Sequence, residues 1–315
     1  MSKYIIKRVI MAIVTLLIIT FVLFLLVRIM PGNPFPSERM SAEAIAAKRI
    51  EMGLDKPILV QFGEYIKNIF EKGSFGKGSS LYNGAPIATV LPKCINNSFS
   101  IGGISICFGV LIGLVLGIAA ALNRGRFWDV FCTVLSIIGV CVPSYVFMIF
   151  LQYFLAYKAT VFPFFFDNSR FLLSSILPAF SLSLFSMSTV ARFTRNEMVE
   201  VMDSDYVLLA ESKGMIGTKL VTKHILRNAL IPIVTVIAPL VVDLLTGALV
   251  VEKIYGINGL GKLMVDAIAG EGIDYNYVLA LGIIYSALYI GIMLVLDVVY
   301  GILDPRIRVT AKKEA

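Results

Sequence analysis

Charged residues are scarce in this chain. Asp, Glu, Lys and Arg make up 16% of the 315 residues, whereas hydrophobic residues make up 58%. A water-soluble domain is typically about 25% charged and about 45–50% apolar. One soluble core of this length cannot bury so much apolar surface. The composition therefore excludes an ordinary soluble protein and indicates that lipid surrounds much of the chain.

Histidine and paired cysteines are almost absent as well. The sequence has one histidine, His224, and its four cysteines never form a Cys-x-x-Cys pair (Cys94, Cys107, Cys132 and Cys141). These patterns argue against a disulfide framework and against a zinc site. Neither the H-E-x-x-H nor the G-x-S-x-G motif of hydrolases occurs. We therefore expect no metal site, no cofactor and no catalytic residue, and hence a chain that is not itself an enzyme.

The most prominent feature of the sequence is a set of long apolar runs. A helix needs roughly 20 predominantly apolar residues to cross the hydrocarbon core of a membrane. The runs that meet this length cover residues 9–28, 98–122, 130–157, 172–190, 229–251 and 277–303. The first is longer than the roughly 7–15 residues of a signal-peptide core and lacks a cleavage site, so we expect it to be retained. The sequence thus predicts an all-α membrane protein with six transmembrane helices.

The basic residues predict how these helices are oriented. Lys and Arg are concentrated in the cytoplasmic loops of membrane proteins, although long loops cross the membrane largely regardless of charge. If the N-terminus lies inside, the short outer loops carry only a few basic residues: Lys158, Arg170, Lys253 and Lys262. We therefore predict that both termini are cytoplasmic. Because the charge of +7 is divided among loops, it does not indicate nucleic-acid binding.

Two polar segments separate the apolar runs. Residues 31–97 contain two stretches with helical pattern, 41–52 and 60–71, followed by a Gly/Ser-rich region. Residues 191–228 have mixed charge and helical periodicity, interrupted at Gly214 and Gly217. We therefore divide the chain into a first transmembrane helix (1–30), a small extracytoplasmic subdomain (31–97) and a five-helix core (98–315) with a cytoplasmic loop at 191–228.

Small residues and prolines predict how the helices pack. Small side chains four residues apart on one helix face let neighbouring backbones approach closely in lipid. Gly109, Gly113 and Gly117 have this spacing in the second run, and Ser174, Ser181 and Ser188 form a similar stripe in the fourth. Pro143 and Pro178 lie inside predicted spans and are expected to kink them.

Residues 256–263 (GINGLGKL) nearly match the phosphate-binding loop G-x-x-x-x-G-K-[ST]. Leu263 replaces the hydroxyl residue that would hold magnesium, and the segment follows a membrane span instead of a buried strand. We expect a glycine-rich turn here and no nucleotide site.

Asp243 is an acid near the middle of the fifth run. A charge deep in a bilayer is expensive and usually faces a cavity or a partner. A position on a translocation path and a structural pairing are both compatible with its place in the sequence.

The cytoplasmic loop carries a family resemblance. Residues 205–214 (DYVLLAESKG) and 224–232 (HILRNALIP) resemble the coupling-loop signature of ATP-binding cassette (ABC) importer permeases. The general form is E-A-A, three residues, Gly, nine residues, then I-x-L-P. Gly214 matches it, whereas residues 208–210 and 224–227 depart from it and are similar to the dipeptide, oligopeptide and nickel branch. The resemblance implies an ATPase-coupling role for Asp205, Tyr206, Ala210, Glu211, Lys213, Gly214, His224 and Arg227.

Other segments are similar to the same branch. They are residues 28–34 (RIMPGNP), 53–57 (GLDKP), 251–252 (VE) with 259–261 (GLG), and 304–308 (DPRIR). The resemblance therefore extends over nearly the whole chain. In the loop, a small apolar set (Val207, Leu208 and Met215) among polar residues suits docking into a cleft on a soluble partner.

The resemblance implies the fold of a type I ABC importer permease that forms half of a pore for oligopeptides or dipeptides. Its implied partners are a second, homologous permease, two cytoplasmic ATPase subunits, an extracytoplasmic substrate-binding lipoprotein, the peptide and membrane lipid, with no nucleic acid. Its implied location is a bacterial or archaeal cell membrane. A nickel or nickel-chelate importer is an alternative, because that branch shares these motifs. An ion-coupled secondary transporter is another, but no internal repeat supports it.

Overall fold

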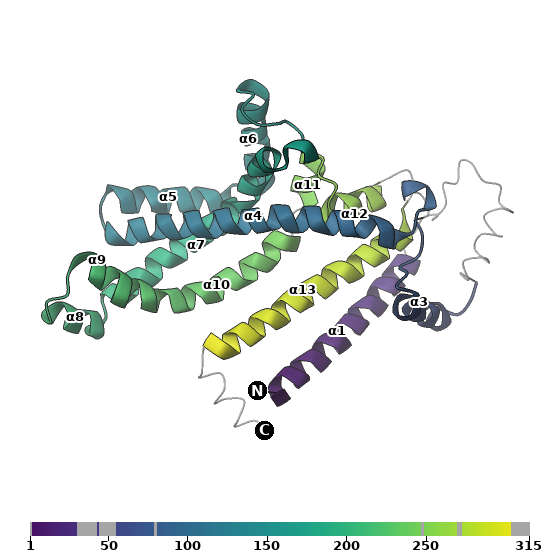
Figure 1. Ribbon diagram of the computed structural model, residues 1–315, viewed down its shortest axis with the longest axis horizontal. Helices are drawn as coiled ribbons and strands as arrows, with labels where there is room; N and C mark the ends of the chain where they lie inside the picture. Colours follow the sequence, from purple (N-terminus) through teal and green to yellow (C-terminus); the bar gives the residue numbers. More distant parts are fainter. Residues whose placement is uncertain are drawn as a thin grey trace. The chain divides into compact units, whose positions relative to one another are not determined.

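The computed structural model describes residues 2–29, 43, 55–78, 81–246, 249–269 and 273–303. The regular secondary structure in these ranges is helical, apart from an isolated bridge between Lys77 and Pro86. It divides into two compact units, one built from Met1–Ser98 and Asn258–Val298, the other mainly from Phe99–Ile257. Figure 1 shows the helices of both. The all-α class expected from the sequence is confirmed.

The first unit is built around the terminal helices. Its elements are α1 (Ser2–Ile29), α3 (Ile58–Lys72), η2 (Leu81–Gly84), the start of α4 (Ile87–Leu122), α12 (Leu260–Ala269) and α13 (Tyr275–Leu303). Phe24 of α1 packs with Leu279 and Ile283 of α13. The two helices run side by side in Figure 1. The ring of Phe62 on α3 lies edge-on to those of Phe21 and Phe24, at 5.1 and 5.6 Å between centroids. The helix predicted at 60–71 is confirmed by α3.

A buried carboxylate fixes the start of α13. Asp274 is fully buried, and its carboxylate accepts hydrogen bonds from the backbone N–H groups of Tyr277 (3.3 Å) and Leu81 (3.2 Å). The first bond caps the helix, because it satisfies an N–H that has no partner within the helix. The second ties the segment before α4 to α13. This polar segment is therefore joined to the apolar helices by specific contacts.

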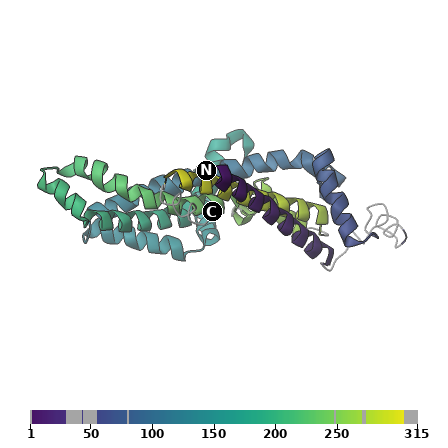
Figure 2. The same cartoon turned by 90° about the horizontal axis from the view of Figure 1, so that it is seen from below.

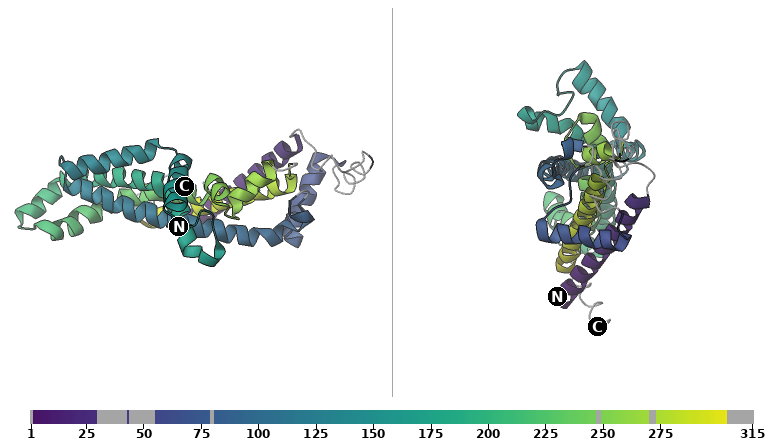
Figure 3. Two further views of the ribbon diagram at one scale, coloured as in Figure 1. Left: turned by 90° about the horizontal axis from the view of Figure 1, so that it is seen from above. Right: turned by 90° about the vertical axis from the view of Figure 1, so that its right-hand side faces the viewer.

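The second unit is organised around α7. Its elements are the rest of α4, α5 (Phe127–Cys141), α6 (Ser144–Leu151), the π-helical η3 (Gln152–Lys158), η4 (Asn168–Arg170), α7 (Phe171–Met202), α8 (Asp205–Ser212), α9 (Gly217–Leu220), the π-helical η5 (Val221–Leu226), α10 (Arg227–Thr246) and α11 (Leu249–Tyr255). Helices α5, α6 and α10 pack against α7, and the apolar stretch of α7 is 67% buried. Figures 2 and 3 show α8 and α9 at one end of this unit and α6 at the other.

The predicted glycine stripe is where α4 meets α7. A Cβ atom placed on Gly113 would lie 2.7 Å from the carbonyl oxygen of Met187 and 2.8 Å from Cβ of Val190. One placed on Gly117 would lie 2.5 Å from Cβ of Thr194. Any side chain would have to push the helices apart, so the stripe serves close packing, as expected.

Within the described residues, five helices are long and apolar enough to span a membrane, and a sixth span results if α5 and the helix after it count as one. The kink predicted at Pro143 in the third span is confirmed, and it is large, because the chain bends by 104° between Cys141 and Ser144. Pro143 explains the break, since the residue before a proline is driven out of the helical region and Val142 has an extended conformation. Pro178 lies inside α7 without ending it.

Some predictions fall on other parts of the chain. The helix predicted at 41–52 lies outside the described residues except for Glu43, and the motif at 304–308 lies outside them altogether. The fifth predicted span is described up to Thr246 in α10 and from Leu249 in α11. The three-part division of the chain stays a prediction.

Candidate functional site

The loop predicted at 191–228 is largely helical. Residues 191–202 continue α7 to Met202, so the polar connection begins only at Asp203. Ser204 then takes an extended conformation, and its carbonyl accepts hydrogen bonds from the N–H groups of Val207 (3.1 Å) and Leu208 (3.2 Å). A new helix, α8, therefore starts here in a separate direction from α7.

Gly214 ends α8 in a way that requires glycine. Its φ of 85° is left-handed. Its N–H donates to the carbonyl of Glu211 (2.8 Å), and the N–H of Met215 donates to that of Ala210 (3.1 Å). These two bonds define a Schellman end, which terminates a helix with a left-handed residue. Among the described residues, no atom lies within 4 Å of a Cβ built on Gly214. Glycine is therefore required by the left-handed backbone and not by a lack of room for a side chain.

One face of α8 packs against the chain itself. Val207 and Ala210 are 2% and 5% exposed and belong to a cluster with Leu220 and Ile225, against which Met215 also packs. The expectation that Val207 docks into a partner was therefore wrong, and Met215 is partly covered by the chain itself. They attach the short helix to α9, η5 and the end of α7.

The other face of α8 is apolar and exposed. Tyr206, Leu208 and Leu209 are 45%, 63% and 56% exposed, and Ile216 in the turn beyond is 79% exposed. Several large apolar side chains exposed within one short segment are typical of an interaction site. Sequence reasoning identified Tyr206 and Leu208 of this set but not Leu209 or Ile216, because the exposure of these residues depends on what η5 and α9 cover.

Polar residues surround this exposed face. Asp205, Glu211, Lys213 and Arg227 are exposed, as expected for a docking surface. His224 is half-buried in the π-helical turn η5, and among the described residues no group hydrogen-bonds to its Nε2. The structure thus brings the expected residues 205–214 together on α8 and its end, with His224 and Arg227 on the segment packed beside them.

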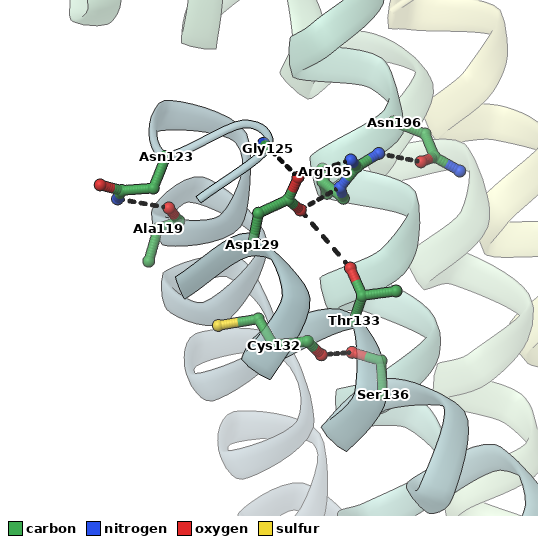
Figure 4. A network of polar contacts seen from close by, with 9 residues as sticks. All are labelled: Ala119, Asn123, Gly125, Asp129, Cys132, Thr133, Ser136, Arg195 and Asn196. Atoms are coloured by element: carbon green, nitrogen blue, oxygen red, sulfur yellow. Dashed lines mark hydrogen bonds and ion pairs between the residues drawn. The ribbon is translucent and has the colours of Figure 1, made fainter. Parts of the chain in front are cut away.

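A polar network next to this site was not anticipated. Figure 4 shows Asp129, in the first turn of α5, facing Arg195 of α7. Arg195 donates through Nε (2.6 Å) and Nη2 (2.8 Å), and the N–H of Gly125 donates to the same carboxylate (2.9 Å). Arg124 in turn pairs with Asp203 through two contacts of 3.0 and 2.9 Å.

The sequence gave a weak signal of this network. Asp129 lies one residue before the predicted third span, and Arg195 lies in the predicted loop, so neither was counted as a charge in the membrane. An acid in the first turn of a long apolar helix was the available clue.

The position of Asp243 narrows its possible roles. It lies in the last turn of α10, at the end of the candidate span Gly217–Leu244 and not near its middle as expected, and its side chain is exposed. Serines of α7 bond to backbone carbonyls instead, as Ser181 does to Leu177 (2.8 Å), and within the described part of the chain none bonds to Asp243. Pairing with these serines therefore does not explain this acid.

Residues 256–263, which nearly match a phosphate-binding loop, contain the end of one helix and the start of the next. Gly256 has a φ of 70°, and the N–H of Ile257 donates to the carbonyl of Glu252 (2.8 Å), which terminates α11. Helix α12 starts only at Leu260. This agrees with the expected glycine-rich turn.

Comparison with known proteins gives a consistent result. Residues 113–309 match the family described as binding-protein-dependent transport system inner membrane component, and residues 1–90 match its N-terminal companion. The chain is 36% identical to the dipeptide transport system permease protein DppB of Bacillus subtilis, covering 99% of this chain and 100% of that protein. It is 34% identical to the oligopeptide transport system permease protein OppB of Haemophilus influenzae, covering 98% of this chain and 100% of that one.

A solved structure shares the fold. A chain of the MetNI methionine ABC transporter, in an inward-facing conformation, superposes with a TM-score of 0.58 over 69% of this chain and 98% of that one, at 15% identity. At this identity the likeness concerns the fold alone.

Proposed function

Because the chain belongs to the family of binding-protein-dependent transport system inner membrane components, we propose that it forms half of the pore of an ABC importer for dipeptides or oligopeptides. The observation that carries this is the near full-length similarity to permeases named for dipeptide and oligopeptide transport. It favours peptides over the nickel alternative. Membership of a binding-protein-dependent family also argues against an ion-coupled secondary transporter.

The second half of the pore is a similar but distinct permease, and two ATPase subunits dock on the cytoplasmic side. The exposed face of α8 supports the docking, because Tyr206, Leu208 and Leu209 lie among exposed charges. Such a face suits a cleft on a soluble protein, where the apolar side chains are buried and the charges stay at the rim.

The chain lies in a bacterial or archaeal cell membrane with both termini in the cytoplasm, an orientation supported by the basic residues of its short loops. Residues 31–97 then lie outside and help to seat a substrate-binding lipoprotein. The packing of α3 on α1 supports an ordered cap.

The permease contributes movement and a path, and its partners hydrolyse the ATP. Closure of the ATPases on ATP moves α8 and switches the pore from inward-facing to outward-facing, and hydrolysis resets it. Asp243 lies on the path, because an exposed carboxylate in the last turn of the apolar helix α10 needs water or a partner charge. There it attracts the ammonium group of a peptide.

Uptake by the assembled transporter tests this function. The permease, its companion permease, the ATPases and the binding protein are reconstituted in liposomes, and uptake of labelled di- and oligopeptides and of ⁶³Ni is measured with and without ATP. We expect ATP-dependent peptide uptake that disappears when this chain is omitted. Nickel uptake without peptide uptake, or peptide uptake driven by an ion gradient, would refute the proposal.

A further inference from the structure

The turn between α4 and α5 (residues 123–126) is built as a rigid connection. The N–H of Arg126 donates to the carbonyl of Asn123 (2.9 Å), and the side-chain amide of Asn123 donates to the carbonyl of Ala119 in the last turns of α4 (2.8 Å). The N–H of Gly125 donates to Asp129 (2.9 Å) in the first turn of α5. The turn is therefore bonded at both ends to the helices it connects.

An inner ion pair attaches this turn to the body of α7. Both carboxylate oxygens of Asp129 accept from Arg195, and the Asp129 side chain is 7% exposed. Two parallel N–H···O bonds between planar groups fix orientation as well as distance. The start of α5 thus has one defined position against α7.

An outer ion pair attaches the same turn to the junction between α7 and α8. Arg124 donates through Nη1 to both oxygens of Asp203 at 3.0 and 2.9 Å. Asp203 is the last residue before Ser204, where α8 begins. Since Arg195 and Asp203 are eight positions apart, the two attachment points lie about 12 Å apart along the helix axis.

We infer that the α4–α5 turn is a second coupling element, in which Arg124, Asp129, Arg195 and Asp203 are positioning residues that carry the movement of α8 to α5. One attachment would allow the turn to pivot on α7, but two separate attachments do not. Helix α5 leads directly to the bend before Pro143, so movement at the α7–α8 junction also reaches α6. This inference rests on the proposed function, because it needs an ATPase that moves α8.

Variants of the outer ion pair can test the coupling role without a large loss of folding stability. Its side chains are 53% and 63% exposed, and exposed pairs contribute little to folding. Three variants of the reconstituted transporter are compared with the wild type: Arg124→Asp, Asp203→Arg, and the double variant that exchanges the two charges. Arg126→Asp is the matched control, because Arg126 is exposed in the same turn and takes part in neither ion pair.

The measured quantity is peptide imported per ATP hydrolysed, at equal amounts of assembled complex. We expect each single variant to lower this ratio by up to about fivefold, the factor that corresponds to the strongest exposed pairs. The double variant should recover most of it, and Arg126→Asp should match the wild type. Unchanged ratios in the single variants, no recovery in the double variant, or an equal loss in Arg126→Asp would overturn the inference. Failure of the proposed function is recognised separately, since the wild type itself would then import no peptide.

Discussion

Gly214 shows how one residue can set the geometry of α8, the helix proposed to dock on an ATPase. Its left-handed backbone ends α8 and lets Met215 return to the cluster that holds Val207 and Ala210. The sequence motif predicted this glycine because its requirement is local. The direction in which Tyr206 and Leu209 point was not predictable, because it depends on which side of α8 the rest of the chain covers.

Gly214→Val should impair transport. A branched side chain in the left-handed region costs roughly 1–2 kcal/mol, which favours a different end of α8. Gly214→Asn is the control, because asparagine adopts this conformation more readily. ATP-dependent peptide uptake should fall in the valine variant and remain largely intact in the asparagine variant. Equal uptake by both would show that the helix end has no part in coupling.

Asp243→Asn should reduce peptide uptake while leaving assembly and ATP hydrolysis normal. The change keeps the size and removes the charge that would attract a peptide ammonium group. Asp243→Glu keeps the charge and should retain most of the uptake, so uptake is measured for both variants alongside peptides with a blocked N-terminus. If the Asn variant imports as well as the wild type, Asp243 serves only packing.

At the scale of helices, the sequence predicted those features that depend on a single segment of the chain. The apolar runs, α3 and the glycine stripe of α4 followed from residue type and spacing. The ion pair between Asp129 and Arg195 did not, because its partners are 66 positions apart and meet only when α5 packs on α7. The 104° bend at Pro143 was underestimated for a related reason. A proline predicts a break in a helix, but the direction of the next helix is set by its contacts.

The contact between α4 and α7 should not tolerate added volume. In Gly113→Ala, the new methyl group would meet the Met187 carbonyl at 2.7 Å, and such overpacking costs about 1–3 kcal/mol. Gly103→Ala is the matched control on the same helix, because no atom lies within 4 Å of its added Cβ. Thermal unfolding of the purified complex should show a lower midpoint for the first variant only. Equal midpoints would mean that the helices separate without cost.

At the scale of the whole molecule, the orientation proposed from the distribution of basic residues can be tested by labelling. Cys107 and Cys141 are exposed in the chain, so the four native cysteines are first replaced by alanine. Single cysteines are then placed at Lys67 on α3 and at Lys213 after α8. An impermeant maleimide should label only the first in intact cells and only the second in inverted vesicles. The opposite pattern would reverse the orientation proposed for every helix.

The buried ion pair also bears on the order in which the chain is made. Asp129 leaves the ribosome 66 residues before Arg195, which at 5–20 residues per second is a delay of roughly 3–13 s. During this interval the carboxylate lacks the guanidinium of Arg195. Asp129 lies in the first turn of α5, so its carboxylate can remain hydrated at the membrane surface until Arg195 has been made. The contact that holds the start of α5 against α7 can therefore form only after residue 195 has been made.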